Sequence, residues 1–314
     1  MKKIFFAVTF GMCIFFSACS QDSSLSVRNN VESFVTIEDD LGNEIIFKEK
    51  PKRIVVTSAS FMESLHSVGA NIVGYPESKN KAPEWAKDIP NIGHVYQIDV
   101  ERLLACNPDL VVINAGMNEK ILDILNKNDI SALVIKMKTY DEVKHALKIF
   151  SKLSDNPEKG EQLIKKMDDD IQNIVDKIPE EKKQVTIIHS TTQGMSIQTD
   201  NSIAGNIVKM LGWENITSDI LSPEENTDSI AYSMETLTER NPEIIFVTSM
   251  GNPDEIKLKM DQLIASNEAW QSLQAIKHNR LYYLPQDMFL LSPGLDYPKA
   301  VKYMARLVYP DIFK

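Results

Sequence analysis

The chain has 314 residues, of which 43% are hydrophobic and 25% charged, and its formal net charge is −10. This length and composition are typical of a soluble globular protein with room for two domains of ordinary size, and they exclude a disordered chain. The excess of acidic residues argues against nucleic acid as a partner, because phosphate backbones are bound by basic surfaces.

The N-terminal segment has the pattern of a secretion signal. Two lysines precede an apolar stretch at residues 4–16, which is too short for a comfortable membrane span, and small residues then lead to Cys19. We expect a signal peptide at residues 1–18 that is cleaved before Cys19. Polar residues without a periodic pattern follow, so we expect a flexible tether at residues 19–33.

The three cysteines do not form a disulfide framework or a zinc motif. Cys13 leaves with the signal peptide and Cys19 is at the cleavage site, so Cys106 remains alone in the folded part. It lies in an apolar helical stretch, where we expect it to pack as a small hydrophobic side chain.

Residues 34–154 are expected to form a first α/β lobe. Alternating apolar residues about a Gly-Asn turn predict a β-hairpin over residues 35–47. Ser60 and Glu63 have the spacing of a capping box, which would open a helix that Gly69 ends. The other predicted elements are strands at 53–58, 72–74 and 132–135, an irregular Pro-rich stretch at 76–90, and helices at 118–126 and 141–153.

One pattern occurs twice, at residues 101–113 and 235–247. Each copy starts as a short helix, has an Asn-Pro pair at which a helix must stop, and continues as an all-apolar run. Such a run is typical of a strand that is covered on both faces of a parallel sheet. We therefore expect two α/β lobes built on one plan, with a cleft between them that suggests a ligand.

Residues 155–180 are predicted to be a long helix that links the two lobes. Asn156 and Pro157 suit its first positions, one apolar stripe follows its length, and Pro179 stops it. About 20 residues at ~1.5 Å each make a rod about 30 Å long, enough to reach from one lobe to the other. A stiff helical link of this kind would limit hinge opening.

Residues 181–314 are expected to form the second lobe. Its predicted elements are strands at 185–189 and 281–284, helices at 201–211, 254–265 and 297–308, and an irregular acidic stretch at 218–228. The second copy of the repeated pattern contributes a further helix and strand to this lobe.

Ligands of parallel α/β sheets collect at the carboxyl ends of the strands. This rule nominates the loops at 58–60, 114–117, 190–193 and 248–251, and the segments 94–96 and 287–288 could also reach the cleft. The candidate ligand-binding residues on these segments are Ser58, Ser60, Tyr96, Met117, Ser190, Thr191, Met250, Gly251 and Met288. For the methionines, packing in the core is the alternative interpretation.

The histidines do not predict a metal centre. A site for bare zinc or manganese needs about three imidazoles with a carboxylate, and only His66, His94 and His189 lie near predicted strand ends. A bare metal-ion receptor remains an alternative. We expect no enzyme, because the sequence has no nucleophile elbow, phosphate-binding loop, Gly-x-Gly-x-x-Gly or His-Glu-x-x-His motif. A metallocluster enzyme would show paired Cys or His on facing strand ends.

Glu101 and Glu235 occupy the second position of their predicted helices, after Asp99 and Ser233 as N-caps. A carboxylate at that position offsets the positive end of the helix dipole, which stabilises the helix by about 0.3–1 kcal/mol. Docking onto a basic partner is the other interpretation. Sequence periodicity by itself favours the first.

Several segments together carry a family resemblance that extends from Val35 to the C-terminus. They are residues 51–56, both Glu…Asn-Pro repeats, residues 201–205 with 211–216, and the closing Ser-Pro-Gly-Leu-Asp-Tyr at 292–297. With these segments the chain resembles the substrate-binding lipoproteins of bacterial ABC importers for iron complexes and cobalamin. The resemblance implies an α/β fold of two Rossmann-like lobes joined by a long backbone α-helix, the class III periplasmic binding protein architecture, with modest movement on ligand binding.

The same resemblance implies partners and a location. Glu101 and Glu235 would face arginines of the permease, and Cys19 would carry the lipid that anchors the protein to a membrane outside the cytoplasm. The expected partners are therefore an ABC permease with its ATPase, a small-molecule cargo and the membrane, for a protein that is a monomer. A sensory or adhesion module on the same scaffold, without transport, is the alternative class.

Within this family, residues 81–101 and 250–255 resemble heme-binding surface lipoproteins. Those proteins hold the heme iron with a Met of the first lobe and a His of the second, and the corresponding residues here are Tyr96 and Met250. Both Tyr and Met can ligate heme iron. We expect heme or another iron complex as transported ligand, with no intrinsic cofactor. A ferric siderophore or cobalamin, a corrinoid, would use the same cleft.

Overall fold

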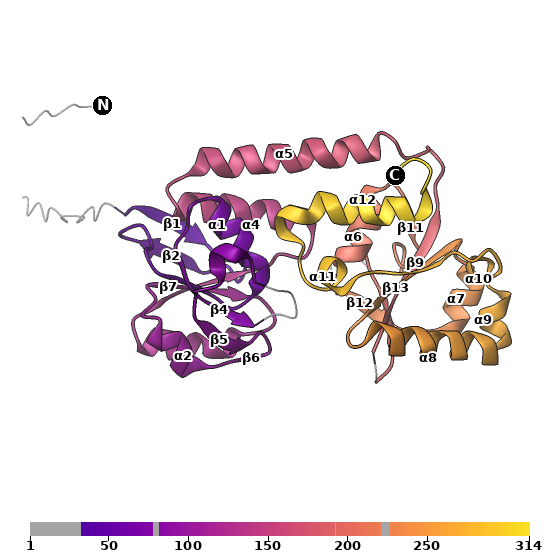
Figure 1. Cartoon of the computed structure of the whole chain (residues 1–314), viewed down its shortest axis with the longest axis horizontal. Coiled ribbons are helices and arrows are strands. Elements are labelled where there is room, and N and C mark those ends of the chain that lie inside the picture. The colour runs from indigo at the N-terminus through magenta and orange to yellow at the C-terminus, as the bar shows by residue number, and fades with distance from the viewer. Residues whose placement is uncertain (1–32, 78–81, 192, 221–226) are drawn as a thin grey trace, which may run out of the picture. The chain divides into compact units, whose positions relative to one another are not determined.

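The structure is a computed structural model that describes residues 33–77, 82–191, 193–220 and 227–314 (Figure 1). The predicted signal peptide, Cys19 and nearly all of the predicted tether lie outside these ranges. Among the helices of the described ranges, none has the length and apolar character needed to cross a membrane.

The first lobe contains a six-stranded sheet and a separate hairpin. The strand order is β6-β5-β4-β3-β7-β8, and all neighbours pair in parallel except β5 and β6. The sheet strands are β3 (Ile54–Val56), β4 (Ile72–Glu77), β5 (Asn91–His94), β6 (Gln97–Ile98), β7 (Leu110–Asn114) and β8 (Ser131–Ile135). The hairpin consists of β1 (Val35–Glu38) and β2 (Glu44–Phe47), which pair antiparallel as predicted.

Helices cover both faces of this sheet. They are η1 (Ala59–Phe61), α1 (Met62–Ser67), η2 (Glu84–Ala86), α2 (Val100–Ala105), η3 (Glu119–Ile121), α3 (Leu122–Lys127) and α4 (Tyr140–Leu153). Neighbouring residues of β7 point to opposite faces: Val112 joins a core cluster with α1 and α4, whereas Val111 joins another with α2 and α3. Burial on both faces explains why β7 is apolar throughout.

The predicted capping box at Ser60 and Glu63 is wrong. Ser58 is the residue that caps, because its side chain accepts a hydrogen bond from the backbone N–H of Ser60 and starts the 3-10 turn η1. Helix α1 then begins at Met62 without a side-chain cap. The chain leaves β3 through a 3-10 turn that already satisfies the first donors, so the capping role moves two residues towards the N-terminus.

The second lobe contains a second sheet, with strand order β12-β10-β9-β13-β14 and β11 paired to the start of β9. Its strands are β9 (Gln184–Ser190), β10 (Met195–Gln198), β11 (Glu214–Asn215), β12 (Ser229–Ala231), β13 (Ile244–Ser249) and β14 (Leu281–Tyr283). The pairs β9–β13 and β13–β14 are parallel, whereas β10 runs antiparallel to both of its neighbours. The sequence patterns did not predict β10, β11 or β12.

Several helical segments accompany the second sheet in the residues that the structure describes. They are α6 (Ile203–Met210), α7 (Met234–Arg240), α8 (Pro253–Ser266), α9 (Glu268–Ser272), α10 (Gln274–Lys277), α11 (Gln286–Phe289), η4 (Gly294–Asp296) and α12 (Tyr297–Val308). The bounds of α12 are those that the sequence predicts. The α/β fold class with two lobes is therefore confirmed.

The repeated pattern forms α2–β7 in one sheet and α7–β13 in the other. Asp99 and Ser233 are the N-caps of the two helices, as predicted, and each accepts a hydrogen bond from the backbone. Asn107 and Asn241 have left-handed backbones, with φ of 45° and 43°. Asparagine tolerates this conformation, which reverses the chain before the proline.

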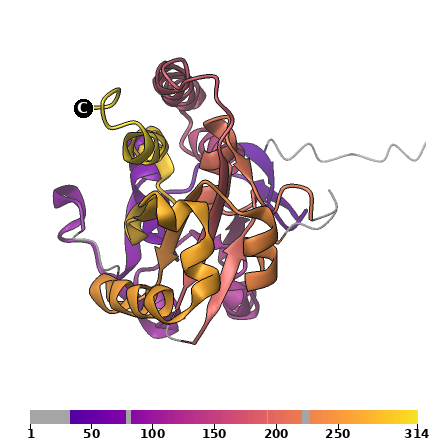
Figure 2. The same cartoon turned by 90° about the vertical axis from the view of Figure 1, so that its right-hand side faces the viewer.

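The linker helix α5 (Pro157–Val175) packs against α4 of the first lobe and α12 of the second (Figure 1). Its apolar stripe, from Ile164 to Ile174, belongs to a core cluster that includes buried residues of both sheets. Figure 2 shows α5 and α12 lying side by side. The helix ends at Val175, before the predicted stop at Pro179.

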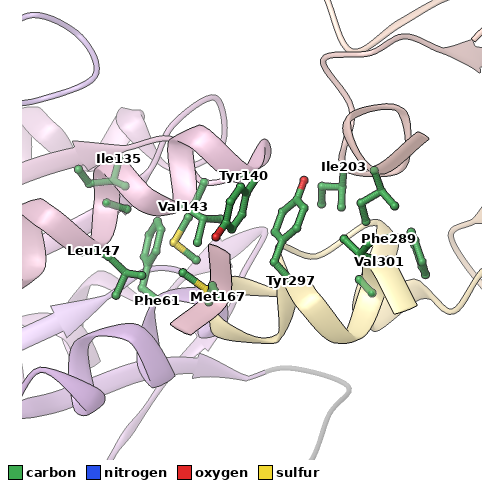
Figure 3. Packing of buried hydrophobic residues seen from close by; sticks show 14 of the residues in the cluster. Phe61, Ile135, Tyr140, Val143, Leu147, Met167, Ile203, Phe289, Tyr297 and Val301 are labelled. Carbon is green, nitrogen blue, oxygen red and sulfur yellow. The ribbon is translucent and has the colours of Figure 1, made fainter. Parts of the chain in front are cut away.

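The connection between the lobes is broader than a single helix. Tyr140 of α4 and Tyr297 of α12 lie ring against ring, with centroids 5.2 Å apart (Figure 3). The side-chain oxygen of Asn206, on α6, accepts hydrogen bonds from the Tyr297 hydroxyl at 3.0 Å and from the Tyr140 backbone N–H at 2.9 Å. The Tyr140 hydroxyl donates to Asp168 of α5. These contacts tie four helices from both lobes together.

Candidate functional site

The predicted loops form two groups, one at the carboxyl ends of the central strands of each sheet. In the second sheet, Ser190 of β9 and Ser249 of β13 are paired at the same level. In the first sheet, the backbone N–H of Asn114, at the end of β7, donates to the Thr57 hydroxyl directly after β3 at 2.9 Å. The strand-end rule therefore brings together the loops within each lobe.

Tyr96 and Met250 form a contact between the two lobes. Tyr96 lies in the turn between β5 and β6, and Met250 follows β13. The Tyr96 hydroxyl is 3.9 Å from the Met250 sulfur, and the two residues are 55% and 42% exposed. Two candidate iron ligands that are 154 positions apart in the sequence thus meet, and both remain open to solvent.

A cavity of about 430 Å³ lies between α1 and the segment after β14. It brings the predicted residues Ser60 and Met288 together. The cavity wall also carries Glu63, Asp287 and Asp296, and the Lys299 side chain pairs with Asp296 at 2.8 Å. Its other lining residues are Ala59, Met62, Tyr75, Ala82, Pro83, Leu291, Ser292 and Pro293.

A second cavity, of about 220 Å³, lies between the ends of β7 and β8 and the start of β12. Lys136 and Lys138 line it from the first lobe, and Asn201 and Asp228 line it from the second. Lys138 and Asp228 form an ion pair across the lobes. The sequence patterns missed these residues, although the strand-end rule, applied to the predicted strand at 132–135, would have nominated the two lysines.

Other predicted residues have local roles. Ser58 and Ser190 are only 6% and 4% exposed, and neither lines the two cavities described above. Met117 is half-buried, with its sulfur 4.0 Å from the Asn114 amide nitrogen. The Thr191 hydroxyl accepts a hydrogen bond from the backbone N–H of Gly194 and so closes the loop after β9.

Gly251, directly after Met250, has a φ of 131°. A Cβ atom at this position would meet no atom within 4 Å, so the backbone conformation and not crowding favours glycine. The next residue, Asn252, caps α8 through its side chain. The loop that carries Met250 is therefore fixed at the helix end and open to solvent on its outer side.

The histidines do not gather into a site. His66 stacks on Trp85, with ring centroids 3.9 Å apart, and His94 lies 3.5 Å from a Glu77 carboxylate oxygen. His189, at the end of β9, has its Nδ1 atom 3.1 Å from the Thr248 hydroxyl, and burial lowers its pKa. In the ranges that the structure describes, no group of three or more His, Cys, Asp or Glu side chains could hold a metal ion.

Comparison with known proteins places this geometry in a family. The profile of the family described as periplasmic binding protein matches residues 54–288, which span both sheets and the linker helix. The chain belongs to the periplasmic binding protein family.

Individual relatives of this binding protein cover most of its length. The high-affinity heme uptake system protein IsdE of Staphylococcus aureus is 27% identical over 269 residues, which are 82% of this chain and 88% of the relative. An ABC transporter substrate-binding protein from Listeria monocytogenes EGD-e has a similar fold, with a TM-score of 0.74 and 24% identity. That match covers 83% of this chain and 100% of the other.

A second similar structure is Staphylococcus aureus SirA complexed with staphyloferrin B, with a TM-score of 0.73 and 23% identity over 88% of this chain and 98% of the other. The family to which the chain belongs is described as one of binding proteins, which agrees with the expectation that the chain is not an enzyme. The family match confirms the two-lobed α/β fold class.

Proposed function

We propose that this periplasmic binding protein is the substrate-binding lipoprotein of an ABC importer and that its cargo is heme. Heme is held between the lobes, with Tyr96 and Met250 as ligands of the iron. The heme uptake system protein IsdE, 27% identical over 82% of this chain, supports the choice of heme over other iron complexes. The protein makes and breaks no covalent bond of its cargo.

The observation that carries this proposal is the contact between Tyr96 and Met250. A phenol oxygen and a thioether sulfur, each able to ligate heme iron, come from separate lobes and lie 3.9 Å apart. Both side chains are exposed, so they can separate to let an iron complex enter between the lobes and would then present an oxygen and a sulfur to it.

The test is a titration of the purified mature protein with hemin, followed by absorption spectroscopy. The parent protein should give a shifted Soret band, and Tyr96→Phe and Met250→Ala should each weaken hemin binding roughly tenfold or more, as expected when metal-site interactions are lost. Tyr303→Phe, on α12, and Met210→Leu, at the end of α6, are matched controls away from the contact and should bind hemin as the parent does.

Ferric siderophores and cobalamin are the alternative cargoes of the same cleft. Each is added separately while the melting temperature is recorded, because a ligand that binds only the folded state raises it. If a siderophore or cobalamin raises the melting temperature and hemin neither does so nor shows a Soret shift, the heme assignment is wrong and the importer assignment stands.

We further propose that Glu101 and Glu235 dock the protein onto the permease. Both side chains are exposed in the first turn of matching helices, α2 and α7, one in each lobe. The positions suit paired contacts with basic residues of a partner. A chain with both glutamates changed to Ala should bind hemin normally but fail to support uptake by cells, whereas unchanged uptake would refute the docking role.

Cys19 is proposed to carry the lipid that anchors the protein to a membrane outside the cytoplasm. The support is the sequence pattern of residues 1–19, because these residues lie outside the described ranges. Cell fractionation tests the proposal: the Cys19→Ala chain should no longer be recovered in the membrane fraction as a lipid-modified protein.

A further inference from the structure

Met250 is the one exposed methionine within the described ranges. Its exposed fraction is 42%, whereas the other methionines there are buried or half-buried, and Met260 and Met304 are nearly inaccessible at 1% and 0%. The open space around Gly251 leaves one side of the loop free for a small reagent. Oxidation of methionine follows exposure, and Met250 is the most exposed methionine in the described structure, so we expect it to react first.

The Tyr96 hydroxyl lies beside the exposed Met250 sulfur and would respond to its oxidation. The Tyr96 hydroxyl points at the sulfur from 3.9 Å, and a thioether is only a weak hydrogen-bond acceptor. A sulfoxide carries an oxygen on the same sulfur and is a polar group. With the donor already in place, the added oxygen would accept a hydrogen bond from Tyr96.

We propose that Met250 is an oxidative modification site at which peroxide lowers the affinity of the protein for its iron-bearing cargo. Hydrogen peroxide transfers one oxygen atom to the sulfur: the O–O bond breaks, an S–O bond forms, the sulfur loses two electrons and water leaves. The effect on cargo rests on the proposed function, whereas the modification itself does not.

Oxidation would act on both iron ligands. The S–O bond takes up one of the two sulfur lone pairs and turns the apolar thioether into a polar, chiral group, so Met250 no longer presents a soft thioether to the iron. A hydrogen bond from the Tyr96 hydroxyl to the sulfoxide oxygen would hold that hydroxyl at Met250 and away from the iron. The two groups thus pair with each other instead of with the cargo.

The modification is tested on the ligand-free mature protein. The protein is treated with hydrogen peroxide, the reagent is removed by desalting, and the methionine-containing peptides are quantified by mass spectrometry over time. Met250 should be oxidised several-fold faster than Met260 and Met304, which serve as internal controls. Equal rates for these three residues would overturn the proposal.

The effect on binding is tested by hemin titration before and after peroxide. The parent and the Met210→Leu control should both lose affinity several-fold, and methionine sulfoxide reductases MsrA and MsrB together should restore it, because each reduces one epimer. Met250→Leu should start with weaker hemin binding, because the thioether is gone, and should lose no further affinity on treatment. Complete oxidation of Met250 with unchanged hemin affinity would overturn the proposal.

The two proposals can fail separately. If untreated protein does not bind hemin, the heme assignment fails, and the titration is repeated with whichever ferric siderophore or corrinoid raises the melting temperature. A peroxide-sensitive affinity for that cargo, absent in Met250→Leu, would support the modification site. An affinity that peroxide leaves unchanged would refute it.

Discussion

At the scale of single residues, burial decides what the polar side chains near the cleft do. Ser58 and Ser190 follow the strand-end rule in position but are almost fully buried, whereas Tyr96 and Met250 project into solvent and meet. The burial of His189 is intermediate between that of these two pairs. It is half-buried at the end of β9, with one ring nitrogen beside the Thr248 hydroxyl. Its protonation is therefore coupled to folding.

The pH dependence of stability should show this coupling. Burial lowers the pKa of His189 in the folded state, while in the unfolded chain a histidine titrates near about 6.5. As the pH falls below that value the unfolded state takes up a proton first, so the free energy of unfolding decreases. His189→Gln should lose less stability between about pH 7.5 and 5 than the parent.

Urea unfolding monitored by circular dichroism at both pH values measures this difference. His278→Gln, which changes an exposed histidine at the end of α10, is the matched control and should keep the pH dependence of the parent. If His189→Gln and the parent lose the same stability on acidification, the buried imidazole is not the group responsible.

At the scale of elements, both copies of the repeated helix–stop–strand unit are attached to their sheets by the same interaction. In each copy, an acidic residue before the strand accepts a backbone hydrogen bond from the neighbouring strand segment. The Asp109 carboxylate, directly after the first Asn-Pro pair, accepts hydrogen bonds from the backbone N–H groups of Lys52 and Arg53 at 2.7 and 2.9 Å. In the second copy, Glu243 accepts from the backbone N–H of Gln184 at 3.3 Å. The acidic residue of the pattern thus joins the start of its own strand to the neighbouring strand.

Removing this connection should destabilise the first lobe. Asp109→Ala leaves two backbone donors without their charged acceptor, and because the site is exposed, water replaces part of what is lost. We expect the free energy of unfolding to fall by about 1–2 kcal/mol. Urea unfolding measures the loss, and Asp311→Ala, an exposed aspartate near the C-terminus, should change stability little. An Asp109→Ala chain as stable as this control would contradict the expectation.

At the scale of the described part of the molecule, one hydrophobic cluster runs through both lobes. It contains Val56 and Val112 of the first sheet, Ile187 and Phe246 of the second, and the buried side of α5. The tyrosine pair and Asn206 fix the orientation of α4 relative to α6 and α12. A joint of this breadth permits less movement than a lone helix would.

The lobes should therefore unfold together. Trp85 reports on the first lobe, and Trp213 and Trp270 report on the second, so tryptophan fluorescence is dominated by the second and circular dichroism by both. We expect the two signals to give coincident denaturant transitions, because separating the lobes would expose the shared cluster. Two transitions at different denaturant concentrations would show that the lobes are independent.

Much of the fold follows from local sequence. The repeated pattern, the caps at Asp99 and Ser233, and the bounds of α12 depend on residues within a few positions of one another, and such interactions can be inferred from the chain alone. The strands β10 and β12 could not be inferred, because they have only four and three residues. In addition, β12 is held by pairing with β10, which is distant in the sequence.

The features of the candidate site can be separated in the same way, into those that follow from local sequence and those that depend on tertiary packing. The sequence by itself determined which loops carry Tyr96 and Met250, because strand ends and turns are local features. Only the tertiary structure decided that their side chains meet, that Ser58 and Ser190 are buried, and that Lys138 pairs with Asp228. These outcomes depend on how the two sheets are oriented relative to each other. The long-range packing of α4, α5, α6 and α12 sets that orientation.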